Sequence, residues 1–527
     1  MKRLVFFLLL LTPVLFAVEP KEVGSATVSL ELQWILTGDF DGSKMLKTYG
    51  FPNTTFQTVS VTADAPFHLE KDSFGNELLV FEWSERGKKT INVKAVAKVN
   101  YDTPYETASP QDSSAFSSPT QLVIVDDSIA TQASMLDGRV ETDFEKLTRF
   151  TEWVHNALVY DDSFWERQPS SADVFIQRKG VCNQYAHLDM ALLRAAGIPS
   201  RFAAGWVYSG KEWAPHAWVE VLIGGKWIPA DPTYNEAGLL DGTHVLFAHG
   251  FDQLDIKEEL SKGLEMEKKQ NIEIVSWNKP RGFFSLALSA PQKIGSSASE
   301  KITVSLVNKD SKEHAVPLFL GVPTQPPELA VKVAGSQSKL VFLPANGMAE
   351  TEWNVLFPKL EDSFTYNFAL QVVSFGQKAN ASVEGEFKNP SPLKEKILLT
   401  KLESVQGPEG VSVLATLSNA GNSDGRASVF VEIGNQSQQQ SILLREGEER
   451  IARFTFSKPL SETQGRLLVT SASGSFAQPF QIIVAPEPLV PEDFDYPALG
   501  LIAGVAVLLV VLSYFLRAKR EPMQESG

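Results

Sequence analysis

Residues 180–186 read Gly-Val-Cys-Asn-Gln-Tyr-Ala, and the third of them, Cys182, is the only cysteine in a chain of 527 residues. An apolar stripe at helical spacing follows directly and runs from Tyr185 to Ala195, with a helix stop at Gly197. A thiol is most nucleophilic as its thiolate, which a helix N-terminus and a neighbouring histidine both favour. Cys182 is therefore a candidate nucleophile, and a single cysteine cannot form an internal disulfide.

A hairpin further along the chain supplies a candidate base and a carboxylate. Residues 216–223 alternate in polarity and lead into a Gly-Gly pair at 224–225, which predicts a two-residue turn. If Ile223 pairs with Lys226 across this turn, His216 and Asp231 lie on the same face as diagonal neighbours, about 7–8 Å apart at the backbone. The opposite face is uniformly apolar. The pattern predicts that the Asp231 carboxylate orients the His216 imidazole.

These three residues suit nucleophilic catalysis by a thiol. The Cys182 thiol would attack an amide or ester carbonyl to form a thioester, while His216 moves the proton and Asp231 fixes the tautomer of the imidazole. The backbone N–H of Cys182 would be one donor to the oxyanion. The side chains of Gln177 and Trp165 are the candidates for a second donor. His187, in contrast, lies inside the apolar helix and is interpreted as structural.

Four runs of sequence, in order, resemble the transglutaminase-like superfamily. They are residues 180–186, residues 192–205 (LLRAAGIPSRFAAG), residues 216–221 (HAWVEV) and residues 227–233 (WIPADPT). The resemblance implies an α+β papain-like core with a Cys-His-Asp triad at Cys182, His216 and Asp231. It also implies an acyl transferase, peptidase or amidase activity. Asn183-Gln184 departs from the acidic residue that many relatives carry after the cysteine, which weakens any inference about the substrate.

The rest of the chain is predicted to be β-rich and divided into domains. Alternating patterns predict an N-terminal β-rich domain over 18–125 and two Ig-like β-sandwiches over 281–390 and 391–485, on either side of the core at 126–280. Within the core, helical spacing from Phe144 to Leu158 predicts one helix, and Ser170 or Ser171 is expected to begin another. The charged stretch 252–270 is also predicted to be helical.

Both ends of the chain carry the patterns of an exported, anchored protein. Residues 1–17 have the layout of a signal peptide, and residues 497–516 are uncharged and long enough to cross a ~30 Å hydrocarbon layer. Basic residues follow in the tail 517–527, which predicts a cytoplasmic tail and a single-pass cell-membrane protein with its ectodomain outside. Residues 486–496 read as a proline-rich acidic stalk. This layout resembles membrane-anchored prokaryotic, particularly archaeal, members of the superfamily.

The sequence also argues against several other functions. A formal net charge of -15 disfavours nucleic acid as a partner. His244 and His249 show no zinc-ligand spacing, and neither an HExxH run nor a G-x-S-x-G run occurs, so no metal or cofactor is expected. Four tryptophans near the site in sequence either wall a substrate cleft or belong to the core: Trp206, Trp213, Trp218 and Trp227.

The leading hypothesis is a cell-surface thiol enzyme that acts on amide bonds of proteins or peptides outside the cell. Hydrolysis is favoured over crosslinking because no sequence feature marks a second, amine-binding entrance. The alternative is a non-catalytic envelope protein in which the core is a scaffold and the β-sandwiches bind other envelope components.

Overall fold

The computed structural model describes residues 19–38, 41–138, 140–362, 364–387, 394–407, 410–457 and 464–484. The expected signal peptide (1–17), stalk (486–496), membrane helix (497–516) and tail (517–527) lie outside these ranges. Among the helices that fall within them, none is both long and apolar enough to cross a membrane.

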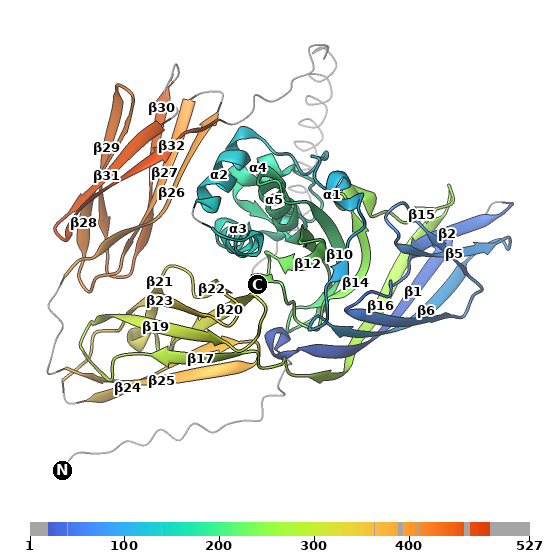
Figure 1. The fold of residues 1–527 in the computed structure, drawn as a ribbon, viewed down its shortest axis with the longest axis horizontal. Helices are drawn as coiled ribbons and strands as arrows, with labels where there is room; N and C mark the ends of the chain where they lie inside the picture. The colour runs from blue at the N-terminus through green and yellow to red at the C-terminus, as the bar shows by residue number, and fades with distance from the viewer. Residues whose placement is uncertain are drawn as a thin grey trace, which may run out of the picture. The chain divides into compact units, whose positions relative to one another are not determined.

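Two four-stranded sheets form the N-terminal domain (Figure 1). The first has the order β16-β1-β6-β3, from β1 (Ser25–Thr37), β3 (Gln57–Ala63), β6 (Lys89–Asn100) and β16 (Glu265–Asn278). The second has the order β15-β2-β5-β4, from β2 (Lys44–Tyr49), β4 (His68–Lys71), β5 (Glu77–Trp83) and β15 (Glu259–Leu260). The short helix η1 (Pro20–Glu22) precedes them.

The helix expected over 252–270 is wrong. This stretch contains only the short turn η3 (Gln253–Asp255), and the rest forms β15 and the start of β16. Strand β16 pairs with β1 over the whole of its length and forms the edge of the sheet. Its charged side chains suit an edge strand, where charge discourages pairing with another chain. Long-range pairing with β1 therefore decides the structure of this segment.

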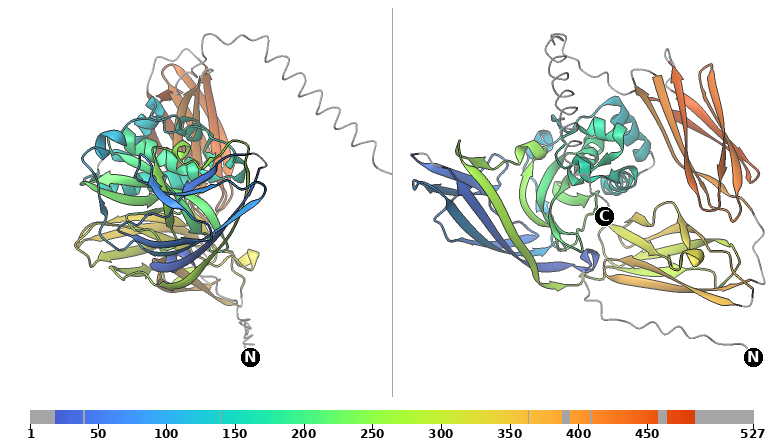
Figure 2. Two further views of the ribbon diagram at one scale, coloured as in Figure 1. Left: turned by 90° about the vertical axis from the view of Figure 1, so that its right-hand side faces the viewer. Right: turned by 180° about the vertical axis from the view of Figure 1, so that it is seen from behind.

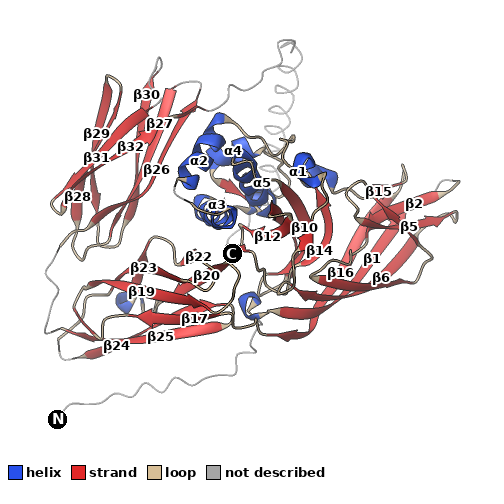
Figure 3. Cartoon of the chain, viewed as in Figure 1, coloured by secondary structure: helices blue, strands red, loops and turns tan. Residues whose placement is uncertain are grey.

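The core is built on a sheet of order β13-β12-β11-β10-β14, with β7 (Glu106–Thr107) beside β12. Its strands are β10 (Ser200–Tyr208), β11 (Trp213–Ile223), β12 (Lys226–Asp231), β13 (Glu236–Ala237) and β14 (Val245–Gly250). Helix α5 (Cys182–Ala195) packs against β10 and β11, and its apolar residues share one hydrophobic cluster with Ala217, Val219 and Val221 of β11. Figure 3 shows the helices gathered around this sheet, while strands dominate elsewhere.

The helices predicted between Phe144 and Ala195 are present. Helix α3 (Asp143–Ala157) is capped by Thr142, whose side chain accepts from the Glu145 N–H, and α4 (Ser171–Gln177) is capped by Ser170. Helices α1 (Asp112–Ala115) and α2 (Asp127–Asp137) were not predicted. In α2 only Ser128, Ile129 and Ala133 are buried, so its apolar stripe is too sparse to recognise.

Two short elements complete the core. Strand β9 (Lys179–Gly180) directly precedes α5 and pairs in parallel with β8 (Val159–Tyr160), which the short helix η2 (Asp162–Phe164) follows.

Two β-sandwiches follow the core (Figure 2). The first pairs sheets of order β17-β19-β23-β21 and β18-β25-β24-β20-β22 around one apolar cluster. Its elements are β17 (Phe284–Ser289), β18 (Lys293–Gly295), β19 (Ser299–Asn308), β20 (His314–Gly321), η4 (Pro327–Leu329), β21 (Lys332–Ala334), β22 (Ser338–Leu343), β23 (Met348–Leu356), β24 (Thr365–Ser374) and β25 (Gln377–Glu386).

The second sandwich has sheets of order β30-β27-β26-β33 and β29-β28-β31-β32 around its own apolar cluster. Its strands are β26 (Ile397–Gly407), β27 (Gly410–Asn419), β28 (Gly425–Ile433), β29 (Gln436–Leu444), β30 (Glu449–Ser457), β31 (Gln464–Ser471), β32 (Gly474–Gln481) and β33 (Ile483–Val484).

Candidate active site

Cys182 is the first residue of α5, whereas the sequence predicts that the helix begins immediately after it. The backbone before it is extended at Val181, and the Gln184 side chain accepts a hydrogen bond of 2.9 Å from the Val181 N–H, which holds the start of the helix. Gly180 allows this approach, because a Cβ there would lie 2.4 Å from the Gln184 Cβ. The thiol is free and buried, with 2% of the residue exposed. The first N–H groups of a helix have no partner within it, so they surround Cys182 with hydrogen-bond donors.

The β11–β12 hairpin has the predicted register. Ile223 pairs with Lys226, and Val219 pairs with Ala230 four positions further from the turn. Gly224 and Gly225 have φ values of +58° and +72°, which this two-residue turn requires and which glycine adopts without strain. The register predicted for the hairpin is therefore confirmed.

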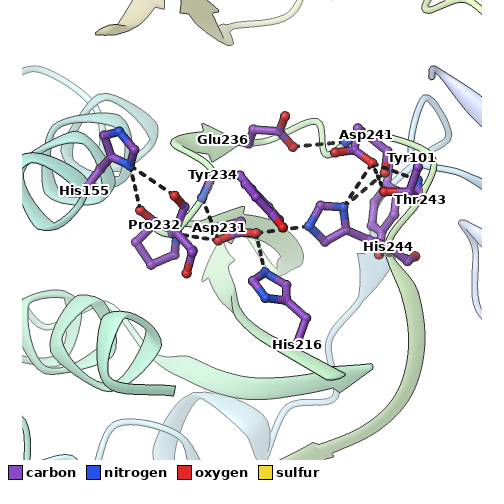
Figure 4. Close-up of polar contacts among 11 residues, drawn as sticks. Tyr101, His155, His216, Asp231, Pro232, Tyr234, Glu236, Asp241, Thr243 and His244 are labelled. Atoms are coloured by element: carbon purple, nitrogen blue, oxygen red, sulfur yellow. Dashed lines mark hydrogen bonds and ion pairs between the residues drawn. The ribbon is translucent and has the colours of Figure 1, made fainter. Parts of the chain in front are cut away.

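The hairpin brings His216 and Asp231 into direct contact. His216 Nε2 lies 2.7 Å from Asp231 Oδ2, and both residues are buried (Figure 4). The Cys182 thiol lies close enough to His216 to raise the pKa of its imidazole. Because Nε2 is engaged by the carboxylate, Nδ1 is the ring nitrogen that serves the thiol. The structure thus brings together the three residues that sequence reasoning singled out.

The electrostatics of the site favour a charged imidazole. Burial lowers the pKa of His216, but the Asp231 carboxylate and the contact with Cys182 outweigh it and raise that pKa to about 9. Burial raises the pKa of Asp231, but His216 and His244 outweigh it and hold that pKa well below its usual range. At neutral pH the site therefore holds an ionised carboxylate beside an imidazolium.

Both oxygens of the Asp231 carboxylate accept hydrogen bonds. Its Oδ1 accepts from the backbone N–H groups of Thr233 and Tyr234 at 2.7 and 3.2 Å. Its Oδ2 accepts from His216 and also from His244 Nε2, at 3.0 Å. Sequence reasoning did not find this role for His244, since it tested the histidines only for zinc spacing. The signal available was a segment, 231–244, that is rich in polar residues although it connects buried strands.

Residues 130–232 match the model of the transglutaminase-like superfamily. The core of this chain belongs to that superfamily. The match contains the whole of α5 and the hairpin, and it ends one residue after Asp231.

Curated relatives resemble the transglutaminase-like core over short segments. An uncharacterized protein of Mycobacterium leprae is 35% identical over 89 residues, which cover 15% of this chain and 32% of the relative. A protein-glutamine gamma-glutamyltransferase of Pseudomonas aeruginosa is 40% identical over 77 residues, 12% of this chain and 11% of the relative. The chain thus spans about a third or less of the length of these relatives.

Among solved structures, a candidate cysteine protease of Cytophaga hutchinsonii aligns with 48% of this chain and 93% of its own, at 21% identity and a TM-score of 0.38.

Two tyrosines flank the thiol of the transglutaminase-like core. Burial raises the pKa values of Tyr160 and Tyr234, and electrostatic interactions with Cys182 and with nearby carboxylates raise them further. Tyr234 also packs on His216, with ring centroids 5.1 Å apart, whereas Tyr160 is 46% exposed. Tyr160 thus marks the side of the site that is open to solvent. Neither residue was singled out from the sequence, where tyrosines in loops carry no distinctive pattern.

The two candidates for a second oxyanion donor are exposed to solvent, whereas the thiol is buried. Trp165 is 45% exposed, and Gln177 is exposed at the end of α4. The buried amide near Cys182 is that of Gln184, whose Nε2 donates to the Arg167 carbonyl and whose oxygen accepts from Val181. The Cys182 N–H therefore stays the one oxyanion donor that the described residues identify.

The histidine and the tryptophans that the sequence singled out besides the triad are wholly or partly buried. His187 is fully buried, and its Nε2 accepts from the Gln253 N–H at 3.3 Å, which suits a structural histidine. Trp218 and Trp227 are buried in the core. Trp206 is half-buried and lines a cavity of about 410 Å³ together with Trp34, Tyr49, Phe51, Pro215 and Phe247.

Among the residues that the structure describes, two overlapping groups of side chains have the spacing of metal ligands. They are His216 with Asp231 and His244, and Glu236 with Asp241 and His244, and within each group the ligand atoms lie within 4.8 Å of one another. His244 bridges both groups, and its two ring nitrogens already face the carboxylates of Asp231 and Asp241. The side chains of the two groups therefore suit a network of hydrogen bonds and ion pairs with one another.

Proposed function

We propose that the transglutaminase-like core is a thiol enzyme that acts on amide bonds of proteins or peptides through Cys182. The observation that carries the proposal is the position of His216, whose Nε2 lies 2.7 Å from Asp231 Oδ2 and whose imidazole is close enough to Cys182 for the thiol to raise its pKa. An imidazole that is buried, oriented and cationic at neutral pH is the partner that a thiolate nucleophile needs.

The geometry supports a two-step reaction. The Cys182 thiolate attacks the carbonyl carbon, and the oxyanion that forms lies near the N–H groups at the start of α5. His216 then donates its Nδ1 proton to the leaving amine, which breaks the C–N bond and leaves a thioester on Cys182. In the second step His216 removes a proton from an incoming nucleophile, whose attack releases the acyl group and restores the thiol.

We favour water as the incoming nucleophile, which makes the enzyme a peptidase or amidase. The rival acceptor is a primary amine, and the 40% identity to a protein-glutamine gamma-glutamyltransferase over 77 residues favours it. Incubating the full chain with glutamine-containing peptides, with and without a primary amine, separates the two by mass spectrometry. Free acid or cleaved chains support hydrolysis. An amine adduct that forms while neither of them does would establish transfer.

A matched set of variants tests whether the core is catalytic at all. Cys182→Ala should abolish both products, and Asp231→Asn should reduce turnover by about 10³–10⁴-fold, because His216 loses its orientation. Ser209→Ala, in an exposed turn that follows β10, is the control and should leave the rate unchanged. Product formation by Cys182→Ala at the wild-type rate would rule out the thiol mechanism, whereas a wild-type chain that forms no product would favour a scaffold that binds envelope components through the β-sandwiches.

We further propose that the enzyme works at the cell surface, as a single-pass membrane protein whose substrates are outside. The apolar runs at 1–17 and 497–516 and the basic residues after 516 support this proposal. Protease added to intact cells should then digest the core while sparing an epitope placed after residue 527. A core that is protected in intact cells and digested only after lysis would contradict the surface location.

A further inference from the structure

We propose that His244 and Asp241 are positioning residues, which hold the Asp231 carboxylate in the place and charge state that orient His216. This inference rests on the proposed function, because it assigns the outer part of the same site. The residues form a chain of contacts that runs from Asp241 through His244 and Asp231 to His216 (Figure 4).

His244 controls one of the two oxygens of Asp231. Backbone N–H groups fix Oδ1, whereas Oδ2 receives only side-chain donors, His216 at 2.7 Å and His244 at 3.0 Å. A carboxylate held at one oxygen can still rotate and pull its partner out of line. The second imidazole prevents this, because it fixes Oδ2 from a direction different from that of His216, with the two ring planes inclined at 66°.

The His244 ring is itself held firmly. Its Nδ1 lies 3.4 Å from Asp241 Oδ1 and 3.3 Å from the Asp241 carbonyl oxygen. Asp241 Oδ1 also accepts from the backbone and the hydroxyl of Thr243, and the Asp241 N–H donates to Glu236 Oε2. Three rings, those of Tyr101, Trp218 and Tyr234, meet the imidazole edge-on at 5.4–6.3 Å. The orientation of His244 is therefore determined on every side.

The charges of this chain alternate. Burial lowers the pKa of His244, but Asp241 and Asp231 outweigh it and raise that pKa well above its ordinary value. Burial and the charge of Asp241 raise the pKa of Glu236 to about 8, so Glu236 carries a proton at neutral pH. His244 is thus a cation between two carboxylates. The titratable groups that face it are Asp231 and His216 from the hairpin, Asp241 and Tyr234 from the connecting loops, Glu236 from β13 and Tyr101 from the end of β6.

Replacing this cation should move the whole pH profile of the thiol. His244→Gln keeps a neutral donor near Asp231 but removes a positive charge whose ring lies 5.6 Å from that of His216. Without that charge, proton loss from the thiol and from the imidazolium both become harder. Cys182 is the only thiol, so alkylation by iodoacetamide measures it directly. We expect the midpoint of alkylation to rise by about one pH unit, and the rate at pH 6 to fall about tenfold.

Two further variants separate positioning from a merely structural role. Asp241→Asn leaves His244 in place but weakens its charge, so the profile should move in the same direction by a smaller amount, about threefold at pH 6. His249→Gln is the matched control, a buried histidine on β14 that pairs with Glu220 at 3.1 Å, while Arg201 keeps Glu220 paired. This control should alkylate at the wild-type rate. Folding of each variant is checked by circular dichroism and thermal unfolding.

A folded His244→Gln protein with the wild-type pH profile would overturn the inference, even if its melting temperature were lower. Should this variant fail to fold, ¹⁵N-histidine NMR of the wild-type chain decides the question. His244 protonated on both nitrogens at pH 8 supports the inference, and a neutral ring overturns it. A wild-type thiol that reacts like free cysteine, with a midpoint near 8.5, would instead overturn the proposed function. The charge of His244 would still be read independently by NMR.

Discussion

The transglutaminase-like core and the second β-sandwich bury very different side chains. In the core, charged or titratable residues such as Asp189, His216, Asp231 and His244 are almost fully buried. In the described part of the sandwich over 394–484, the buried polar residues are all neutral, and Asn419 is typical, donating to the Ser423 and Leu444 carbonyls across a loop. Burying a charge is costly unless it is paired. In the core, the charges of His216, Asp231 and His244 are paired with one another, whereas the described residues of the sandwich bury no charged side chain.

The strongest test of this contrast removes the nucleophile. Cys182→Ala deletes one buried sulfur and should lower turnover by at least about 10³-fold, since the triad works as a unit. The fold should survive, because alanine suits the first turn of α5. Turnover on a peptide substrate and thermal unfolding measure the two effects. Wild-type turnover by Cys182→Ala would contradict this contrast between the core and the sandwich, and so would a variant that fails to fold.

Sequence reasoning succeeded where structure is local. The Gly224-Gly225 turn determined the register of the hairpin, and with it the contact between His216 and Asp231. It failed where distant segments meet. The charged segment 265–278 became a strand only because β1 lies beside it, 228 or more positions earlier in the chain. His244 likewise reaches Asp231 through a loop whose path depends on the packing of β14 against β10. No period or spacing in the sequence records such contacts.

The converse test destabilises the second β-sandwich and leaves the residues of the transglutaminase-like core unchanged. Phe454 is 1% exposed in the apolar cluster of the second sandwich, and Phe454→Ala should destabilise that domain by about 3–5 kcal/mol through the cavity it leaves. Alkylation of Cys182 should keep its wild-type pH profile. Hydrogen exchange of peptides from 410–457 measures the local stability, which a global melting curve of a multidomain chain would not isolate. A shifted alkylation profile would show that the two regions are coupled.

A pH titration distinguishes the stability of the transglutaminase-like core from that of the second β-sandwich. The folded-state pKa of His216, about 9, lies above its unfolded value of about 6.5. Its contribution to stability is therefore complete below pH 6.5 and is lost as the pH rises through 9, amounting to at most about 3 kcal/mol. Hydrogen exchange of α5 and the hairpin should show this loss in the wild type. Asp231→Asn should largely remove the pH dependence, and peptides of the second sandwich should not show it in either protein.

The smallest effect is expected for a substitution of Gly180. This substitution tests the position of the helix start separately from the charges around the thiol. Gly180→Ala would place a Cβ 2.4 Å from the Gln184 Cβ, so either the helix start or the Gln184 side chain must move. Because Gln184 holds the Val181 N–H, we expect a shifted Cys182 and an alkylation rate about tenfold lower at pH 7, without the rise in midpoint expected for His244→Gln. Gly282→Ala, where a Cβ meets nothing within 4 Å, is the control. An unchanged rate in Gly180→Ala would mean that the thiol tolerates movement of the helix start and depends on its charged partners alone.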